Sequence, residues 1–247
     1  MPRYFIEVFY RGTKYSGFQI QQNANSIQAE IEKSLSIFFK QLFSLTGSSR
    51  TDAGVHALSN YFHFDSEILD SYTPEKFSRI VYNLNAILPD DIVVKRIYRV
   101  ANEAHCRFDA VSREYRYYVY QQKDPFQSDR AYYYPYQLDI GLLNQAAGAI
   151  TAHNDFTTFS KRNTQVSTFN CNILKSEWRM EQDIFVYTVM ANRFLRGMVR
   201  GLVGTMLKVG TGKISIDQFQ KIIQSRDSSN ADFSVPPQGL FLVNVQY

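Results

Sequence analysis

The stretch from Gly47 to His56 holds the side chain best suited to chemistry in this chain of 247 residues. It reads Gly-Ser-Ser-Arg-Thr-Asp-Ala-Gly-Val-His, with Asp52 between Arg50 and the turn-forming pair Ala53-Gly54. In an extended segment Arg50 and Asp52 share a face, because successive side chains alternate with period two. A neighbouring arginine holds a carboxylate ionised, and an ionised Asp can act as a nucleophile or a base. Taken alone, the triplet is more simply a surface or strand ion pair.

A second candidate is the segment from Phe194 to Val209, which has the spacing of an amphipathic helix. The face opposite its apolar residues is basic and rich in glycine: Arg193, Arg196, Gly197, Arg200, Gly201, Gly204 and Lys208. Each interior glycine costs about 1 kcal/mol relative to alanine, so these glycines indicate a close approach to the helix. A phosphate backbone or a partner chain, held by the arginines, would approach in this way. A solvated basic face, with another helix of the same protein packed on the glycines, explains them equally well.

The predicted strand from Ser112 to Gln121 carries interleaved tyrosines and arginines. Period two places Arg113, Tyr115, Tyr117 and Val119 on one face. Such a face can stack bases and neutralise phosphates, but aromatic residues are also good strand formers with a core role. A tyrosine beside a nucleophilic Asp would add a stacking surface and a hydroxyl able to transfer a proton.

Metal and nucleotide cofactors are not expected from the sequence. The histidines and cysteines lack metal-ligand spacing and form no disulfide framework: His56, His63, His105, His153, Cys106 and Cys171. The chain also lacks a glycine-rich nucleotide-binding loop and a serine nucleophile elbow. We expect two reduced thiols, and neither a nucleotide cofactor nor a serine nucleophile.

The composition indicates an ordinary globular protein, with 45% hydrophobic and 20% charged residues. The formal net charge of +4 is compatible with an anionic partner. No apolar stretch approaches the roughly 20 residues of a membrane span. Glu7 lies where a signal peptide needs an apolar core, so we expect a cytoplasmic protein.

Strands and helices that must position these residues are interspersed along the chain. Alternating patterns predict strands over residues 3–10, 58–64, 92–100, 112–121, 173–180, 185–190 and 240–245, with a hairpin turn at Gln182-Asp183. Helical spacing predicts helices over 27–42 with Asn25 as N-cap, from Thr73-Pro74 onward, over 142–150, over 194–209, and after the capping pair Ser215 and Gln218. This pattern indicates an α+β fold.

A division near residue 105 would give two comparable parts, 1–104 and 105–247, between which we see no sequence repeat. Residues 125–137, 153–170 and 226–238 lack periodicity and are predicted as loops. The 153–170 loop carries Lys161 and Arg162. It is either a mobile substrate-contacting loop or a solvated connection.

Motifs along essentially the whole chain resemble one family, the TruA-type tRNA pseudouridine synthases. They share its order and spacing: Gly12-Thr13-Lys14-Tyr15-Ser16-Gly17-Phe18-Gln19, Arg50-Thr51-Asp52-Ala53-Gly54-Val55-His56-Ala57, Leu84-Asn85-Ala86-Ile87-Leu88-Pro89, Arg107-Phe108-Asp109-Ala110, Ser112-Arg113-Glu114-Tyr115-Arg116-Tyr117, Met198-Val199-Arg200 with Gly204, and Pro237-Gln238-Gly239-Leu240-Phe241-Leu242.

The resemblance implies that uridine is isomerised to pseudouridine in the anticodon arm of tRNA, at positions 38 to 40, without metal or cofactor. Asp52 matches the catalytic nucleophile, whose attack on the sugar or on the base stays open. Tyr115 matches the tyrosine that packs on the target base, and Arg200 matches the partner of the catalytic Asp. Arg50 matches an arginine that helps displace the target nucleotide. The implied architecture is two halves with antiparallel sheets flanked by helices, meeting at a central RNA-binding cleft in a homodimer.

These roles meet the physical demands of the reaction, because a stacked base must be flipped out and the detached uracil must be retained. Three alternatives stay open. One is a non-catalytic RNA-binding module. Another is a hydrolase, with Asp65 or Asp109 as a second carboxylate. The third is a paralogue acting on another uridine, because residues 168–173 lack an arginine common in the family.

Overall fold

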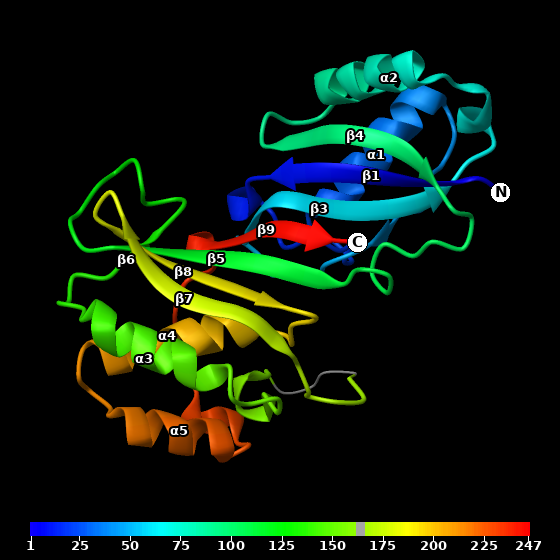
Figure 1. The fold of residues 1–247 in the computed structure, drawn as a ribbon. Coiled ribbons are helices and arrows are strands. Elements are labelled where there is room, and N and C mark those ends of the chain that lie inside the picture. The colour runs from blue at the N-terminus through cyan, green and yellow to red at the C-terminus, as the bar shows by residue number, and fades with distance from the viewer. Residues whose placement is uncertain (162–165) are drawn as a thin grey trace. The chain divides into compact units, whose positions relative to one another are not determined.

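The structure, a computed structural model, describes residues 1–161 and 166–247. These residues form nine strands and five α-helices, which confirms the α+β fold class (Figure 1). The chain divides into two compact units: unit 1 comprises residues 1–111 with 242–247, and unit 2 comprises residues 112–241. Within the described ranges, every helix is too short or too polar to cross a membrane.

Unit 1 is built on an antiparallel sheet with two helices. Its central strand β1 pairs with both β3 and β4, and the short β2 pairs with β3. Helix α2 packs against β4 and contacts α1 (Figure 1). The bounds of these elements are β1 Arg3–Tyr10, α1 Ile27–Phe39, β2 Thr46–Gly47, β3 His56–Asp65, α2 Pro74–Ile87 and β4 Ile92–Val100.

The core of unit 1 follows the predicted periodicity, with two corrections at α1. Its N-cap is Ser26, whose hydroxyl accepts from the Ala29 N–H at 3.2 Å, and not Asn25. The helix ends at Phe39, because Lys40 adopts a left-handed conformation with φ of 57°. Leu42, which was predicted on the apolar face of this helix, is therefore exposed to solvent.

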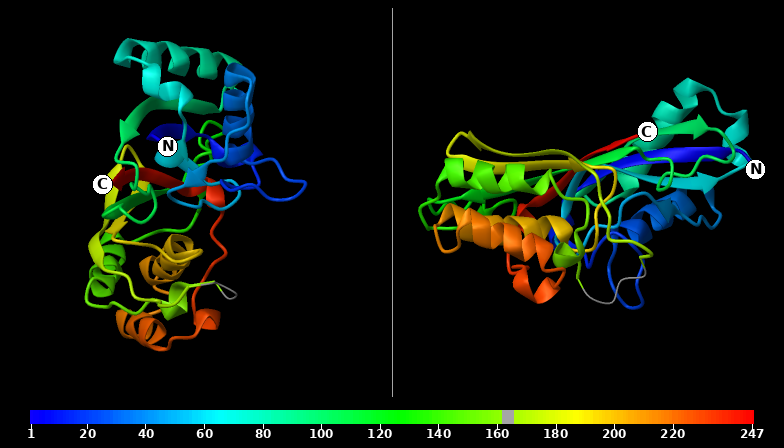
Figure 2. Two further views of the ribbon diagram at one scale, coloured as in Figure 1. Left: turned by 90° about the vertical axis from the view of Figure 1, so that its right-hand side faces the viewer. Right: turned by 60° about the horizontal axis from the view of Figure 1, so that its bottom comes forward.

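Unit 2 has an antiparallel sheet in which β8 lies between β5 and β7. Helix α3 packs against β7, and α5 lies on the far side of α3 from this sheet (Figures 1 and 2). Helix α4 contacts both α3 and α5. The bounds are β5 Ser112–Tyr120, β6 Tyr132–Tyr133, α3 Ile140–Ile150, β7 Ile173–Glu181, β8 Ile184–Ala191, α4 Met198–Gly210 and α5 Ile216–Gln224.

In unit 2 some of the predicted turns and helix ends are confirmed and others are corrected. The turn at Gln182-Asp183 and the capping box of α5 are confirmed. The predicted loop 125–137 contains β6, which pairs parallel to β5. Helix α4 begins at Met198 and not at Phe194, because Gly197 is left-handed with φ of 74° and closes a turn before it.

The 153–170 loop is only partly described, and Arg162 lies outside the described residues. Its first part is bonded to other segments of unit 2. The Asp155 carboxylate lies 2.9 Å from Nε of Arg226, and the Lys161 N–H donates to the Arg196 carbonyl at 2.9 Å. Residues 155–161 are thus attached to the end of α5 and to the segment before α4.

The last strand, β9 (Leu240–Gln246), begins in unit 2 and ends in unit 1. In unit 1 the Val111 N–H donates to the Gln246 carbonyl at 2.8 Å, and the Tyr247 hydroxyl donates to the Cys106 carbonyl at 2.7 Å. The Tyr247 ring also packs on Phe5, with ring centroids 5.2 Å apart. A division of the chain into 1–104 and 105–247 does not include this return of residues 242–247 to unit 1.

Candidate active site

The backbone around Asp52 forms a short extended segment followed by a tight turn. Thr51 is buried, with its hydroxyl 2.8 Å from that of Tyr10, whereas Arg50 is exposed and Asp52 is half-buried. This alternation agrees with the predicted period of two. The turn at Ala53-Gly54 is closed by the Val55 N–H, which donates to the Asp52 carbonyl at 3.2 Å.

A second segment, residues 12–18, supports this turn and is called the supporting loop below. The Phe18 N–H donates to the Thr51 carbonyl at 3.1 Å, and the Gly54 N–H donates to the Tyr15 carbonyl at 3.3 Å. The Gly12 N–H donates to Nδ1 of the buried His56 at 3.1 Å. Backbone bonds from one loop therefore hold both sides of Asp52.

Two glycines let the supporting loop come this close. A Cβ at Gly12 would overlap the Val55 carbonyl. Gly17 has φ of 122°, a conformation that favours glycine, and a Cβ there would lie 3.1 Å from the Thr51 oxygen. The hydroxyl of the buried Tyr15 donates to Asp91 at 2.6 Å, which anchors the loop; burial and this carboxylate raise the Tyr15 pKa.

The stretch before Asp52 is fixed from β3. The buried Asn60 amide donates to the Ser49 carbonyl at 2.9 Å and to the Tyr10 hydroxyl at 3.2 Å. The Ser48 N–H donates to the Tyr61 carbonyl at 2.7 Å. Residues on either side of the half-buried carboxylate are therefore positioned by hydrogen bonds to other segments.

In unit 2, Tyr115 lies on the buried face of β5. Its ring meets that of Phe194 edge to face, with centroids 4.9 Å apart, and 8% of the residue is exposed. On the same face Tyr117 is fully buried and donates its hydroxyl to the Pro236 carbonyl at 2.7 Å. Burial raises the Tyr117 pKa, against the opposing effect of the Arg200 charge. Tyr117 is thus a core residue.

Arg200, on the first turn of α4, is half-buried and bonded to the segment 232–236. Its Nε donates to the Val235 carbonyl at 2.8 Å, and its Nη2 contacts the Phe233 carbonyl at 3.5 Å. This segment lies within a stretch predicted only as a loop. Together with the Tyr117 bond, these contacts connect the segment to β5 and α4.

The glycines of α4 are explained by the same segment. A Cβ at Gly201 would lie 2.7 Å from the Phe233 ring, and one at Gly204 would overlap the Asp232 carbonyl. The Asp232 N–H donates to the Thr205 hydroxyl at 3.0 Å. What approaches these two glycines is therefore a loop of the same chain, neither RNA nor another helix. Arg193 and Arg196 precede the helix, so the predicted basic helical face is wrong.

Each predicted site residue is described within its own unit. Arg50 and Asp52 lie in unit 1, and Tyr115 and Arg200 lie in unit 2. The roles of these four residues, including the pairing of Asp52 with Arg200, stay predictions. The sequence did not indicate the parts played by the supporting loop and the 232–236 segment, although closely spaced glycines mark both contacts.

Among the described residues one group of side chains has the geometry to hold a metal ion: His63, His105 and Cys106 of unit 1. Sequence spacing did not indicate this group, because the chain brings His63 to Cys106 across 43 positions. The group contains none of the four predicted site residues.

Comparison with known proteins agrees with the motifs. The family model described as tRNA pseudouridine synthase matches residues 8–109 and 146–247, more than half of the chain. A tRNA pseudouridine synthase A of Parabacteroides distasonis is 45% identical over 100% of this chain and 96% of its own length. Relatives of the same name from Bacteroides fragilis and Staphylococcus aureus are 44% and 38% identical, over 100% and 98% of this chain and 97% and 90% of their own lengths. The chain therefore belongs to the tRNA pseudouridine synthase family.

Proposed function

We propose that this protein isomerises uridine to pseudouridine in the anticodon arm of tRNA, at positions 38 to 40, with Asp52 as the nucleophile. The observation that carries the proposal is the placement of Asp52 in the family-like run Arg50–His56. There a half-buried carboxylate sits on a turn whose backbone is bonded on both sides. A nucleophile held in this way meets its target without a loss of conformational entropy at the moment of attack.

In the proposed reaction the N1–C1′ bond of the uridine breaks and a C5–C1′ bond forms. The C5 proton is lost, and N1 gains a proton, so no atom is added or removed. Asp52 bonds transiently to the sugar or to the base, which keeps the uracil from diffusing away. The reaction needs no metal or organic cofactor.

The other proposed residues act on the flipped nucleotide. Arg50 is exposed and can replace the uridine in its stack. The Tyr115 ring packs on the target base, and its edge-to-face contact with Phe194 supports a fixed ring position. Arg200 pairs with the Asp52 carboxylate, and its two carbonyl bonds support a fixed guanidinium.

The proposal includes a homodimer in the cytoplasm. A net charge of +4 per chain is modest for a protein that holds tRNA. Two copies double this charge, which strengthens the attraction to phosphates.

The test is pseudouridine mapping in tRNA incubated with the purified protein. We expect new pseudouridine at one or more of positions 38 to 40. Asp52→Asn should reduce the rate by at least about a thousandfold, because the nucleophile is lost. Asp70→Asn is the matched control, since Asp70 is a surface carboxylate of the same unit paired with Arg99. Persistent activity in Asp52→Asn would show that another group is the nucleophile.

Arg200→Ala separates catalysis from RNA binding. We expect activity to fall far more than tRNA affinity, because one cation among many phosphate contacts contributes little to binding. Equal losses would make Arg200 a general RNA-binding residue.

The same assays distinguish the alternatives. Binding of tRNA without any product would indicate a non-catalytic RNA-binding module. Release of uracil, or a cut strand, would indicate a hydrolase. Pseudouridine at another position would indicate a paralogue with a different target.

A further inference from the structure

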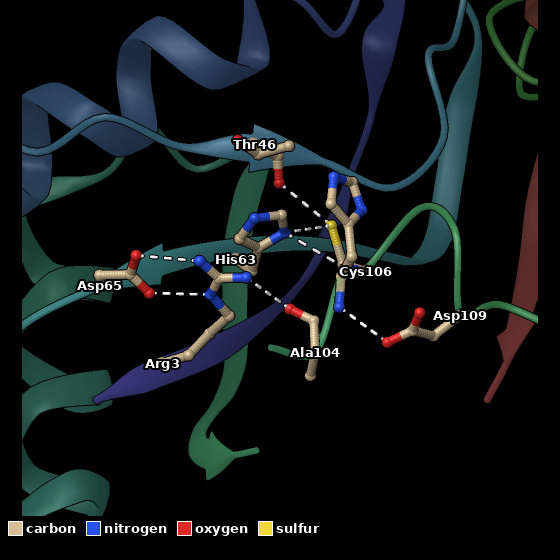
Figure 3. Close-up of polar contacts among 8 residues, drawn as sticks. Arg3, Thr46, His63, Asp65, Ala104, Cys106 and Asp109 are labelled. Atoms are coloured by element: carbon tan, nitrogen blue, oxygen red, sulfur yellow. Dashed lines mark hydrogen bonds and ion pairs between the residues drawn. The ribbon is translucent and has the colours of Figure 1, made fainter. Parts of the chain in front are cut away.

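His63, His105 and Cys106 converge in unit 1, and none of them is among the residues proposed for catalysis. His63 comes from β3, and the other two follow β4 (Figure 3). Nδ1 of His63 lies 3.1 Å from the Cys106 sulfur, and the two imidazole centroids are 4.6 Å apart. One potential ligand atom from each residue lies within 4.8 Å of the other two.

We propose that these three side chains form a zinc site. Zinc bonds to imidazole nitrogen at about 2.0–2.1 Å and to thiolate sulfur at about 2.3 Å, which places tetrahedral ligand atoms roughly 3.3–3.8 Å apart. The ligand atoms lie within 4.8 Å of one another, and Nδ1 of His63 and the Cys106 sulfur are 3.1 Å apart, so these distances bracket that range. Two nitrogens and a sulfur are a ligand set that suits zinc, and solvent would fill the fourth position.

The hydrogen bonds show that Nδ1 carries the lone pair on both rings. Nδ1 of His63 accepts from the Cys106 N–H at 3.3 Å, and Nδ1 of His105 accepts from the Arg107 and Phe108 N–H groups at 3.1 and 3.4 Å. A bound ion would replace the N–H donors on the ring nitrogens that it binds.

Neighbouring groups hold the ligands in place, as outer-shell partners do in metal sites. Before an ion binds, the Cys106 thiol donates to the Thr46 carbonyl at 3.1 Å, a bond that coordination of the thiolate replaces. The Asp109 carboxylate accepts from the backbone N–H of His105 at 2.7 Å, which fixes the chain at that ligand. Arg3 donates to the Ala104 carbonyl at 2.9 Å while it binds Asp65 through two nitrogens (Figure 3). The segment that carries two of the three ligands is thus fixed on β1 and β3.

The site also has a route of entry. Cys106 and His63 are buried, whereas His105 is half-buried, so an ion enters from the His105 side. On binding, the Cys106 thiol releases a proton to solvent and its sulfur bonds to the ion. The ion would tie residues 104–110, which include the family-like run Arg107–Ala110, to strand β3.

The first test uses the intact wild-type protein after removal of metal by a chelator. It is titrated with Zn²⁺ against a chromophoric competitor, and with Co²⁺ as a spectroscopic probe. We expect one ion per chain and a thiolate-to-cobalt charge-transfer band in the near ultraviolet. A cobalt spectrum without this band, or failure to bind Zn²⁺, would overturn the proposal. This test needs no variant, so it holds even if a variant does not fold.

The second test uses the two cysteines as a matched pair. Cys106→Ser should lose the charge-transfer band and at least about tenfold in Zn²⁺ affinity, the scale on which even outer-shell changes act. Cys171→Ser is the control, because Cys171 is also buried but lies in unit 2. His63→Gln should weaken binding similarly, and His153→Gln should not. Equal affinity in Cys106→Ser and Cys171→Ser would make Cys106 a core thiol only.

Zinc binding is measured without RNA. Failure of this inference is therefore distinct from failure of the proposed isomerase activity.

Discussion

The Asp52 turn and the Arg200 helix are each held against a loop of their own unit, but by different groups. At Asp52 the contacts join backbone to backbone, from Phe18 to Thr51 and from Gly54 to Tyr15. At Arg200 the functional side chain itself makes the contact, through Nε to the Val235 carbonyl. A substitution of the Asp52 side chain therefore leaves these two backbone bonds in place. A substitution of Arg200 removes part of the packing of its own surroundings.

The two regions also use glycine differently. Gly12 begins a single turn of 3-10 helix, Gly12–Lys14, where the absence of a side chain serves close approach to Val55. Gly204 lies inside α4, where glycine lowers helix stability and close approach offsets that cost. An added methyl group should therefore affect the two regions unequally.

The largest effect is expected for Gly12→Ala. The new Cβ would overlap the Val55 carbonyl, and neither backbone can move without breaking bonds to the Asp52 turn. We expect a loss of about 3 kcal/mol in the free energy of unfolding, measured with chemical denaturant, together with loss of activity. Gly148→Ala is the control, because Gly148 lies in α3 with open space at its Cβ. That variant should be neutral or more stable by up to about 1 kcal/mol; equal losses in both would contradict the close approach at Gly12.

Glu7→Gln tests a buried charge of unit 1. Glu7 accepts from Ser59 at 2.8 Å and from Arg96 at 2.6 Å. Burial opposes its ionisation, but these hydrogen bonds outweigh that effect and hold the Glu7 pKa below its ordinary value. We expect the variant to lose about 2 kcal/mol at neutral pH.

The pH dependence of this variant has a defined sign. Because the folded pKa is the lower one, ionised Glu7 adds stability above the ordinary glutamate value of 4.5, and this contribution disappears as the pH falls through the lowered pKa. Denaturant unfolding between pH 7 and pH 3 should show the wild type and the variant converging in acid. If the difference in free energy of unfolding between wild type and variant stayed constant across that range, the ionised Glu7 carboxylate would not be its source.

Gly204→Ala should have a smaller effect than Gly12→Ala. Overlap with the Asp232 carbonyl displaces the 232–236 segment, but the gain in helix propensity of about 1 kcal/mol offsets part of the cost. We expect a net loss of about 1 kcal/mol in thermal or denaturant unfolding, with a larger relative loss of activity because the Val235 bond to Arg200 is disturbed. Unchanged activity would show that this segment does not position Arg200.

The smallest effect is expected for Lys208→Ala. Lys208 lies 3.0 Å from Asp232, and both side chains retain contact with solvent. Exposed ion pairs contribute little, so we expect a loss of at most about 0.5 kcal/mol, reduced further in high salt. A loss as large as that for Glu7→Gln would mean that the exposed charge of Lys208 stabilises unit 2 as much as the buried charge of Glu7 stabilises unit 1.

Regular elements were predictable because their signals are local. The capping pair of α5 and the Gln182-Asp183 turn act within a few residues, and both are confirmed. The start of α4 was predicted too early, because the apolar spacing extends back to Phe194. The left-handed Gly197 prevents the helix from beginning before Met198.

Contacts between distant segments were not predictable in the same way. The glycines of α4 indicated a close approach to that helix. The sequence did not identify residues 232–236 as the approaching segment, because that depends on how the chain folds back. His63 and Cys106 meet across 43 positions, so no local spacing could indicate their contact. Asp52 itself was singled out by its residue type and by family resemblance, whereas its support by residues 12–18 required the structure.

The return of β9 makes unit 1 discontinuous, with unit 2 inserted between Val111 and Leu242. During synthesis residues 1–111 of unit 1 emerge before unit 2, yet Val111 donates its N–H to Gln246, which is translated after unit 2. Unit 2 is complete in sequence before unit 1 is. Although domains usually form from the N-terminus onward, the part of this chain that is made first is the part that finishes folding last.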